Sequence, residues 1–166
     1  YYFTGKQEYA AQAAKWYTKA AEQGDAAAQF NLGVFYEQGQ VVPQNFAEAV
    51  KWYRAAAEQE VAPAQCNLGL CYQTGRGVPE NMPEAVRWFK LSAKQGHPKG
   101  MFKYGLMLFL GTGVAKDRIE GAAWMIACLP RADESLKQTV KESIEHLTPD
   151  ERTKAEAAAI EIQKTL

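Results

Sequence analysis

Apolar residues recur three and four positions apart along this chain, in stretches separated by polar segments that contain glycine and proline. This spacing places apolar side chains on one face of an α-helix. In the clearest part of the chain it predicts one helix over about 26–38 and a second over about 46–58. The two apolar faces comprise Ala28, Leu32, Phe35 and Tyr36, and then Ala49, Trp52, Tyr53 and Ala56. The pattern predicts a pair of packed helices.

The same pattern returns at a fixed step. The four tryptophans, Trp16, Trp52, Trp88 and Trp124, stand 36 residues apart. Glycines keep that step in two series, which are Gly33, Gly69 and Gly105, and Gly39, Gly75 and Gly111. Self-similarity at a period of about 20–50 residues is typical of repeat proteins, whose units stack on one another. The chain is therefore predicted to be all-α, an α/α superhelix (solenoid) of 36-residue helical hairpins.

The segment between the two helices of a hairpin contains residues that end one helix and begin the next. Gly39 suits the left-handed cap after a helix, and Pro43 prevents that helix from continuing. A residue that favours the N-cap precedes each second helix, with a glutamate three positions later. These pairs are Asn45 and Glu48, Asn81 and Glu84, and Asp117 and Glu120. The spacing predicts capping boxes, in which the glutamate also reaches back to the N-cap amide.

We predict repeats over 1–130 and a C-terminal helical cap over 131–166. The repeats divide into a partial unit 1–24, with a helix over about 8–22, and full units over about 25–60, 61–96 and 97–130. The cap contains two helices, over about 133–147 and 149–165. Tyr1–Gly5 falls in register with Glu37–Val41, so we expect a chain that opens partway through a repeat, as a mature or trimmed fragment would.

The second unit resembles a known family. Its matching residues are Ala64-Gln65, Asn67-Leu68-Gly69, Tyr72, Gly75, Gly77-Val78-Pro79, Glu84-Ala85-Val86, Trp88-Phe89 and Gln95-Gly96. They resemble the Sel-one-like repeat family, a 36-residue relative of the tetratricopeptide repeat. Residues 28–59 repeat the pattern with Val41 in place of the second glycine. The resemblance covers about 8–129, and it implies a bacterial α/α superhelix that binds other proteins.

Three functions follow from the resemblance. The first is a non-catalytic scaffold or adaptor that binds a partner protein or peptide on its concave surface. The second is a structural component of a bacterial envelope, secretion or polysaccharide-export complex. The third, a cell-wall or β-lactam-binding enzyme, is disfavoured because the chain lacks both a regular cysteine pair in each repeat and a Ser-x-x-Lys motif. The resemblance favours a periplasmic or secreted protein over a cytoplasmic one.

Charge and composition argue against several classes of partner and ligand. The chain has 19 basic and 19 acidic residues and no basic stripe, which argues against a nucleic-acid partner. It has no apolar run long enough to insert into a membrane. His97 and His146 have no matching cluster of ligands, so we expect no metal, no cofactor and no enzyme activity. His97 is interpreted as a solvated turn residue, and His146 as a complement to a helix C-terminus.

The three cysteines replace apolar or small residues of the other repeats, which predicts buried thiols that act as small hydrophobes. Cys66 takes the place of Phe30 and Phe102, and Cys71 that of Phe35 and Met107. Cys128 takes the place of Ala20, Ala56 and Ser92. An odd number of cysteines does not form a disulfide framework.

The candidate binding residues lie on the first helix of each hairpin, outside the apolar face described above. We call them the first-helix row: Phe30, Val34, Glu37, Gln38, Leu70, Gln73, Thr74, Phe102, Leu106, Phe109 and Leu110. Two interpretations stay open. Curvature of the superhelix buries the row, Phe30 and Phe102 first, or part of it forms an apolar groove for a peptide or a helix. Phe109 and Leu110 are the most unusual pair, and the C-terminal helices are a candidate cover for them.

The first helix of the chain has no partner within its own hairpin. We therefore expect an exposed apolar face at Tyr9, Ala13, Trp16 and Tyr17, through which the fragment could self-associate.

Overall fold

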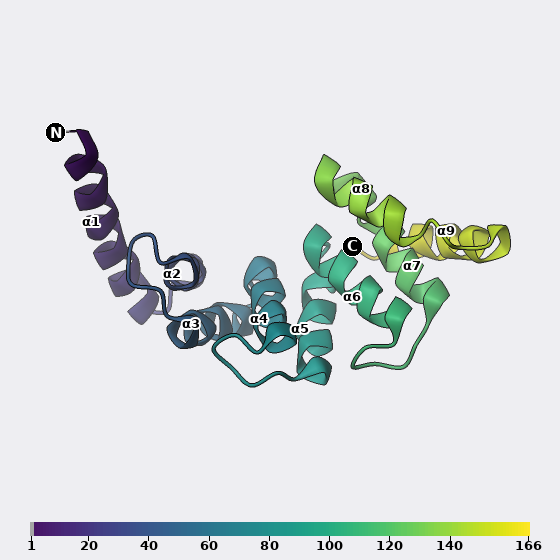
Figure 1. Ribbon diagram of the computed structural model, residues 1–166, viewed down its shortest axis with the longest axis horizontal. Coiled ribbons are helices and arrows are strands. Elements are labelled where there is room, and N and C mark those ends of the chain that lie inside the picture. The colour runs from purple at the N-terminus through teal and green to yellow at the C-terminus, as the bar shows by residue number, and fades with distance from the viewer. Residues whose placement is uncertain (1) are drawn as a thin grey trace. The chain divides into compact units, whose positions relative to one another are not determined.

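The computed structural model describes the backbone of residues 2–166 and the side chains of residues 12–166. Its described residues form α-helices and one short 3₁₀-helix, as the sequence predicts (Figure 1). The helices are α1 (Tyr2–Glu22), α2 (Ala26–Gln38), α3 (Phe46–Glu58), α4 (Ala62–Thr74), α5 (Met82–Lys94), α6 (Pro98–Leu110), α7 (Arg118–Ala127), η1 (Leu129–Arg131), α8 (Glu134–Ser143) and α9 (Pro149–Lys164). They belong to two compact units, Tyr1–Glu80 and Asn81–Leu166.

The predicted bounds hold for the repeat helices and fail at two places. α1 begins at Tyr2 rather than near residue 8. The turn signals of the other repeats are missing there, because Phe3 stands in the register of Gly39 and Gln7 in that of Pro43, so nothing in the sequence stops a helix. α8 ends at Ser143 rather than at 147.

The first helices end on left-handed glycines. Gly39, Gly75 and Gly111 have φ values of 68°, 67° and 75°, and each backbone N–H donates to the carbonyl four residues earlier. A residue without a side chain adopts this conformation at little cost. The glycine series found in the sequence therefore marks the points where each hairpin turns.

The second helices begin on the predicted N-caps, but their capping boxes are incomplete. Asn45 and Asp117 accept hydrogen bonds from the backbone N–H groups of the glutamates three residues later. Their own N–H groups donate to Tyr36 O and Leu108 O, both at 2.9 Å. Since the preceding helix already satisfies these amides, the glutamates have no donor to reach back to. The prediction of full boxes is wrong for these two helices.

The complete capping box lies at the start of α9. Thr148 Oγ1 accepts from the Glu151 N–H at 3.2 Å, and Glu151 Oε2 accepts from the Thr148 N–H at 2.9 Å. Pro149 follows the cap at the first helical position, where its missing N–H costs nothing. The sequence predicts this helix start at the right residue.

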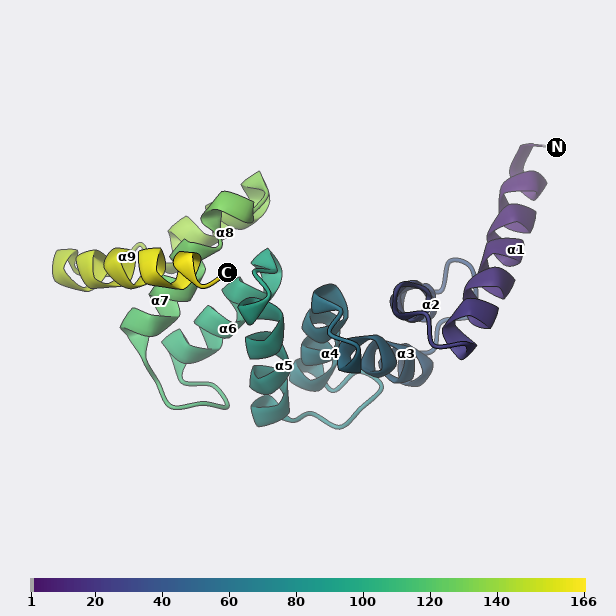
Figure 2. The ribbon, with the colours of Figure 1, turned by 180° about the vertical axis from the view of Figure 1, so that it is seen from behind.

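The core of the first unit forms where α2 packs on α3. A Cβ atom added to Gly33 would lie 2.6 Å from Cδ1 of Tyr53, so the absence of a side chain lets the Tyr53 ring lie against α2. Tyr53 is fully buried, and Ala49 and Ala56 line the same face of α3. On the other side of α2, Leu32 is buried in a cluster with α1. Each helix of this unit thus packs on its neighbour in the sequence, as Figure 2 also shows.

In the second unit, α7 contacts both α6 and α9 (Figures 1 and 2). Both α6 and α7 carry a glycine where they cross, and a Cβ atom on Gly105 would lie 2.5 Å from Gly121 O. The two backbones approach more closely than any side chain would allow. On its other side, α7 is covered by α9, which buries Ala155 and Ala159.

Candidate functional site on the first helices

Some side chains of the first-helix row are buried by packing within their own unit, and others are accessible to solvent. At its start, Phe102 is only 8% exposed, and the equivalent Cys66 is buried. Phe30 is half-buried with its ring 6.0 Å from that of Tyr53. Phe30 and Phe102 therefore belong largely to the packing of their own units.

Two series of equivalent residues remain accessible. Val34 and Leu70 in the first unit, and Leu106 in the second, are each half-buried. One helical turn later the side chains are exposed, and this series is Gln38, Thr74 and Leu110. Leu110 is 57% exposed, which is high for a leucine on a helix of a packed unit. The accessible part of the row thus lies at the C-terminal ends of the first helices.

Glu37 is occupied by an internal hydrogen bond. Its Oε2 accepts from the hydroxyl of Tyr53 at 2.5 Å. Burial and the neighbouring Glu37 carboxylate raise the pKa of Tyr53 far above its usual range. Burial, with a smaller contribution from Glu37, raises the pKa of Cys71 to about 11. Glu37 therefore links α2 to α3 through this hydrogen bond, and its carboxylate is already engaged within the fold.

Phe109 is partly covered, but by Arg118 of α7 rather than directly by the C-terminal helices. The guanidinium of Arg118 lies 4.6 Å from the centre of its ring, and Arg118 Nε is 3.2 Å from Oε1 of Glu151 on α9. Leu110, the next residue, has no such cover, and Gln73 is half-buried at the position equivalent to Phe109. Within the first-helix row, the open apolar residues of the second unit are therefore Leu106 and Leu110, with Phe109 beside them.

The cysteines and His97 have structural roles. All three thiols are free and buried, and burial raises the pKa of Cys128 to about 12. His97 is not a solvated turn residue, because it is half-buried and caps α6, with Nδ1 accepting from the Gly100 N–H at 3.2 Å. Burial lowers the pKa of His97. No group of three or more histidine, cysteine or acidic side chains in the described chain is arranged to hold a metal ion.

Of the exposed face predicted for α1, the described side chains confirm Trp16 alone, and the prediction is wrong for Tyr17, which packs against the core cluster of α1 and α2. Trp16 is 72% exposed, whereas Ala13 and Tyr17 are half-buried and line a cavity of about 590 Å³ between α1 and α2. Tyr17 meets Phe35 edge to face, with ring centres 5.5 Å apart. The Tyr9 side chain lies outside the described residues.

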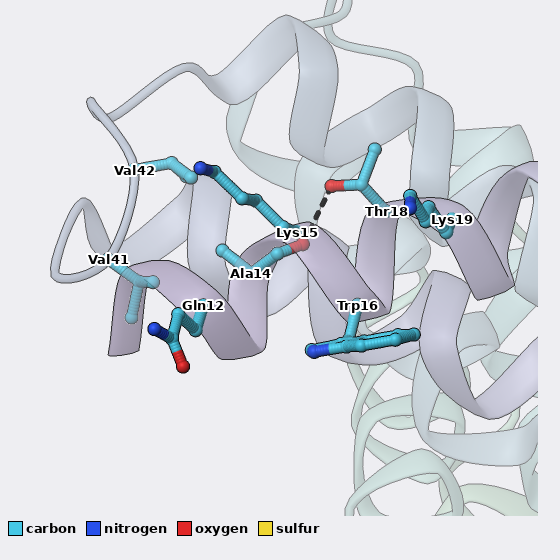
Figure 3. A pocket seen from close by; sticks show the side chains of 8 residues that line it. All are labelled: Gln12, Ala14, Lys15, Trp16, Thr18, Lys19, Val41 and Val42. Atoms are coloured by element: carbon cyan, nitrogen blue, oxygen red, sulfur yellow. Dashed lines mark hydrogen bonds between the residues drawn. The ribbon is translucent and has the colours of Figure 1, made fainter. Parts of the chain in front are cut away.

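A second cavity, of about 610 Å³, was not found by sequence reasoning (Figure 3). It lies between α1 and the loop that joins α2 to α3, and we call it the outer cavity. Its lining residues are Gln12, Ala14, Lys15, Trp16, Thr18, Lys19, Val41 and Val42. The signal that could have revealed it is Val41, which stands where the next two repeats have Gly77 and Gly113.

Comparison with known proteins identifies the family of the chain. The Sel1 repeat profile matches residues 1–25, 26–61, 62–97 and 98–127. The chain belongs to the Sel1 repeat family, and its fold is an α/α solenoid of 36-residue helical hairpins. Proteins of this family are generally scaffolds that bind other proteins, and they are typically non-catalytic. No curated protein matches the chain.

Three solved bacterial structures are similar. Protein c5321, a protective antigen of uropathogenic Escherichia coli with an SLR fold, is 38% identical, with a TM-score of 0.73 over 76% of this chain and 27% of its own. A Sel1 repeat protein of Oxalobacter formigenes is 33% identical, with a TM-score of 0.67 over 76% of this chain and 95% of its own. Cysteine rich protein B of Helicobacter pylori, 16% identical with a TM-score of 0.62 over 80% and 96% of the two chains, shares the fold. This chain thus spans about a quarter of the length of the antigen.

Among the described residues, none of the helices combines the length and the apolar character needed to cross a bilayer.

Proposed function

We propose that this chain is a non-catalytic adaptor that binds a partner protein or peptide through the open part of the first-helix row. The observation that carries the proposal is the pair Leu106 and Leu110, one turn apart on α6, with Leu110 57% exposed. Exposed apolar side chains that adjoin one another are typical of interaction sites. The protein-binding role of the family supports the same function.

The equivalent residues of the first unit support a surface of the same kind. Val34 and Leu70 are half-buried aliphatic side chains, each followed one turn later by an exposed polar residue, Gln38 or Thr74. Apolar residues spaced in this way accept the side chains of a docked helix or extended peptide, and the polar neighbours satisfy its backbone and rim. Each repeat thus carries a surface of the same kind.

The test is capture of a partner by charge variants. The triple variant Val34→Glu, Leu70→Glu, Leu106→Glu places a carboxylate at each apolar position, where a docked partner would bury it at high cost. Immobilised wild type is expected to retain a partner from a lysate of the organism that carries the chain, and the triple variant is expected to lose it. The matched control is Ile160→Glu on α9, where the isoleucine is 55% exposed outside the row.

Two outcomes would contradict the proposal. Equal retention by the wild type and by a triple variant that is still helical would place the site elsewhere. Loss of the partner by Ile160→Glu alone would favour a role as a structural component of a larger complex, assembled through α9. Trp16 and Ile160, both exposed outside the row, are the residues that such an assembly would use.

A further inference from the structure

We propose that the partner segment which docks on α6 is an amphipathic helix that carries two acidic residues beside two large apolar residues. This inference rests on the proposed function and names the chemistry of the partner at that site. The side chains that carry it, which we call the α6 stripe, are Lys99, Lys103, Leu106 and Leu110. The two lysines and the two leucines occupy separate halves of one helix face.

The α6 stripe is the solvent-facing side of α6, which packs between α5 and α7 (Figures 1 and 2). Its residues follow one another at intervals of four, three and four positions, and this spacing places them on one face of a helix. Lys99 and Leu110 are exposed, and Lys103 and Leu106 are half-buried. The other residues from 100 to 108 are buried. A partner that reaches the middle of α6 therefore meets this stripe.

The fold leaves the two lysines without a carboxylate. No described acidic residue forms an ion pair with either of them. In the first unit the equivalent of Lys103 is Asn67, which hydrogen-bonds with the Tyr53 hydroxyl. The second unit has Phe89 in the register of Tyr53, so this hydroxyl is missing. Lys103 thus lacks the internal contact that its equivalent makes.

The combination of charge and apolar surface distinguishes α6 from the first helices of the first unit. The positions equivalent to the two lysines hold no charged residue, and they are Ala27 and Asn31 on α2, and Pro63 and Asn67 on α4. At the other end of the stripe, Leu110 stands where α2 and α4 have polar residues. Both halves of the α6 stripe therefore depart from the repeat pattern.

The sequence around the stripe adds to its positive charge. Between Glu84 and Asp117 there is no acidic residue, and the basic residues are Arg87, Lys90, Lys94, Lys99, Lys103 and Lys116. The chain as a whole is neutral, so its positive charge is concentrated on α5, α6 and the loop that follows. A local excess of one charge attracts partners of the opposite charge and raises their rate of association.

The two halves of the stripe define the chemistry of the occupant. A docked partner removes the lysines from water, which costs free energy unless carboxylates pair with them. Leu106 and Leu110 are stabilised by apolar side chains that exclude water. A nucleic acid would offer phosphates to the lysines and leave the leucines without apolar contacts. The stripe therefore fits a protein segment that is acidic in one half and apolar in the other.

The dimensions of the stripe suit a helix. Lys99 and Leu110 are eleven residues apart, which is about 16 Å along the axis at 1.5 Å per residue. A partner helix with acidic residues at i and i+4 and large apolar residues at i+7 and i+11 presents the same spacing. An amphipathic helix that lays one face against another protein is a common mode of recognition.

The test is a selection of phage-displayed helical peptides on the 166-residue chain. The library has an alanine- and glutamine-rich helix with four random positions at the spacing of the stripe. Wild-type protein is expected to enrich Asp or Glu at two successive random positions, and large apolar residues at the other two. Selection on Lys99→Glu, Lys103→Glu is expected to replace the acids by Lys and Arg and to keep the apolar pair. The same peptides on both proteins would overturn the proposal.

A third selection, on Leu106→Glu, Leu110→Glu, separates this inference from the proposed function. Apolar peptides that show no preference for acids and are lost on this variant would overturn the acidic helix and leave the proposed function standing. Acidic peptides that bind this variant as they bind the wild type would contradict both. A dimer of the free chain that Leu110→Glu dissociates, measured by sedimentation, would make a second copy the occupant and would also overturn the proposal.

Fluorescence anisotropy with a labelled enriched peptide then measures the contribution of the lysines. Its affinity is expected to fall about tenfold or more in Lys99→Glu, Lys103→Glu. The matched control, Lys94→Glu, Lys141→Glu, makes the same change in net charge at exposed lysines outside the stripe, and should bind as the wild type does. Equal losses in the two variants would show that overall charge decides binding, and would overturn the site. Circular dichroism confirms that each variant is folded.

Discussion

At the scale of single residues, Glu37, His97 and the three cysteines serve the fold. Glu37 accepts from the Tyr53 hydroxyl, and His97 caps α6. The contact of Glu37 could not be predicted from the sequence, because a carboxylate and a tyrosine 16 positions apart come together only when two helices pack. The cap at His97 is a local feature that the sequence interpretation missed, although His97 stands at the position of Asp25 and directly precedes Pro98. The burial of the cysteines could be predicted, because each replaces a residue that the repeat pattern assigns to the interior.

The thiols are expected to be inert in the folded protein. Only the thiolate reacts readily, and burial raises the pKa values of Cys71 and Cys128 to about 11 and about 12. A thiol assay with a disulfide reagent at pH 8 should show almost no reaction in the native protein, and three thiols after denaturation. One thiol that reacts at once in the native protein would contradict the buried positions.

His97 gives the second unit a dependence on pH. An N-cap must accept a hydrogen bond, which only the neutral imidazole can do. Since burial lowers the pKa of His97 in the folded state, the unfolded chain binds the proton more tightly. The cap's contribution is therefore present above pH 6.5, the usual histidine value, and is lost as the pH falls through the lower pKa of the folded state.

The variant His97→Asp tests this cap, since Asp25 caps α2 at the equivalent position. At pH 5 the variant should be more stable than the wild type by about 1 kcal/mol, the usual contribution of an N-cap, and at pH 8 the two should be similar. Thermal unfolding followed by circular dichroism measures the difference. The exposed His146→Gln serves as control and should keep the wild-type dependence on pH. An unchanged pH profile in His97→Asp would rule out the cap as its source.

At the scale of the elements, local signals predicted most of the helices and turns. Periodic apolar faces, left-handed glycines and N-caps act within a few residues, so they can be read directly from the chain. Local signals also explain the early start of α1, because the glycine and proline that form the turn in later repeats are missing there. The sequence could not show the close crossing of α6 and α7, where Gly105 faces Gly121.

A single methyl group added where α6 and α7 cross should destabilise the protein. A Cβ atom on Gly121 would lie 2.5 Å from Gly105 O and also from Phe109 N. Alanine favours a helix over glycine by about 1 kcal/mol, but the collision involves backbone atoms that cannot rotate away. We expect Gly121→Ala to lower the free energy of unfolding by about 1–3 kcal/mol, the usual cost of overpacking, as measured by urea denaturation.

The comparison is Gly33→Ala, in which the added methyl group meets the Tyr53 ring. A side chain can shift where a backbone cannot, so this loss of stability should be smaller. A Gly121→Ala variant at least as stable as the wild type would show that α6 and α7 do not cross as closely as described.

At the scale of the whole molecule, the repeat architecture could be predicted from the sequence, and the exposure of the candidate binding residues only in part. The 36-residue step identifies the solenoid, because each unit repeats the same packing. How exposed each side chain of the first-helix row is depends on which residues from other parts of the chain pack over it. Arg118 lies over Phe109, for example, while Leu110 beside it stays open.

The central claim is that a partner docks on the open part of the first-helix row. Site-specific photo-crosslinking tests it most directly, with a benzophenone amino acid at Leu106 and, in a matched protein, at Ile160 on α9. Irradiation in cells of the source organism should join a single partner to the protein labelled at position 106 and none to the protein labelled at position 160. A partner joined from position 160 and not from position 106 would contradict the account.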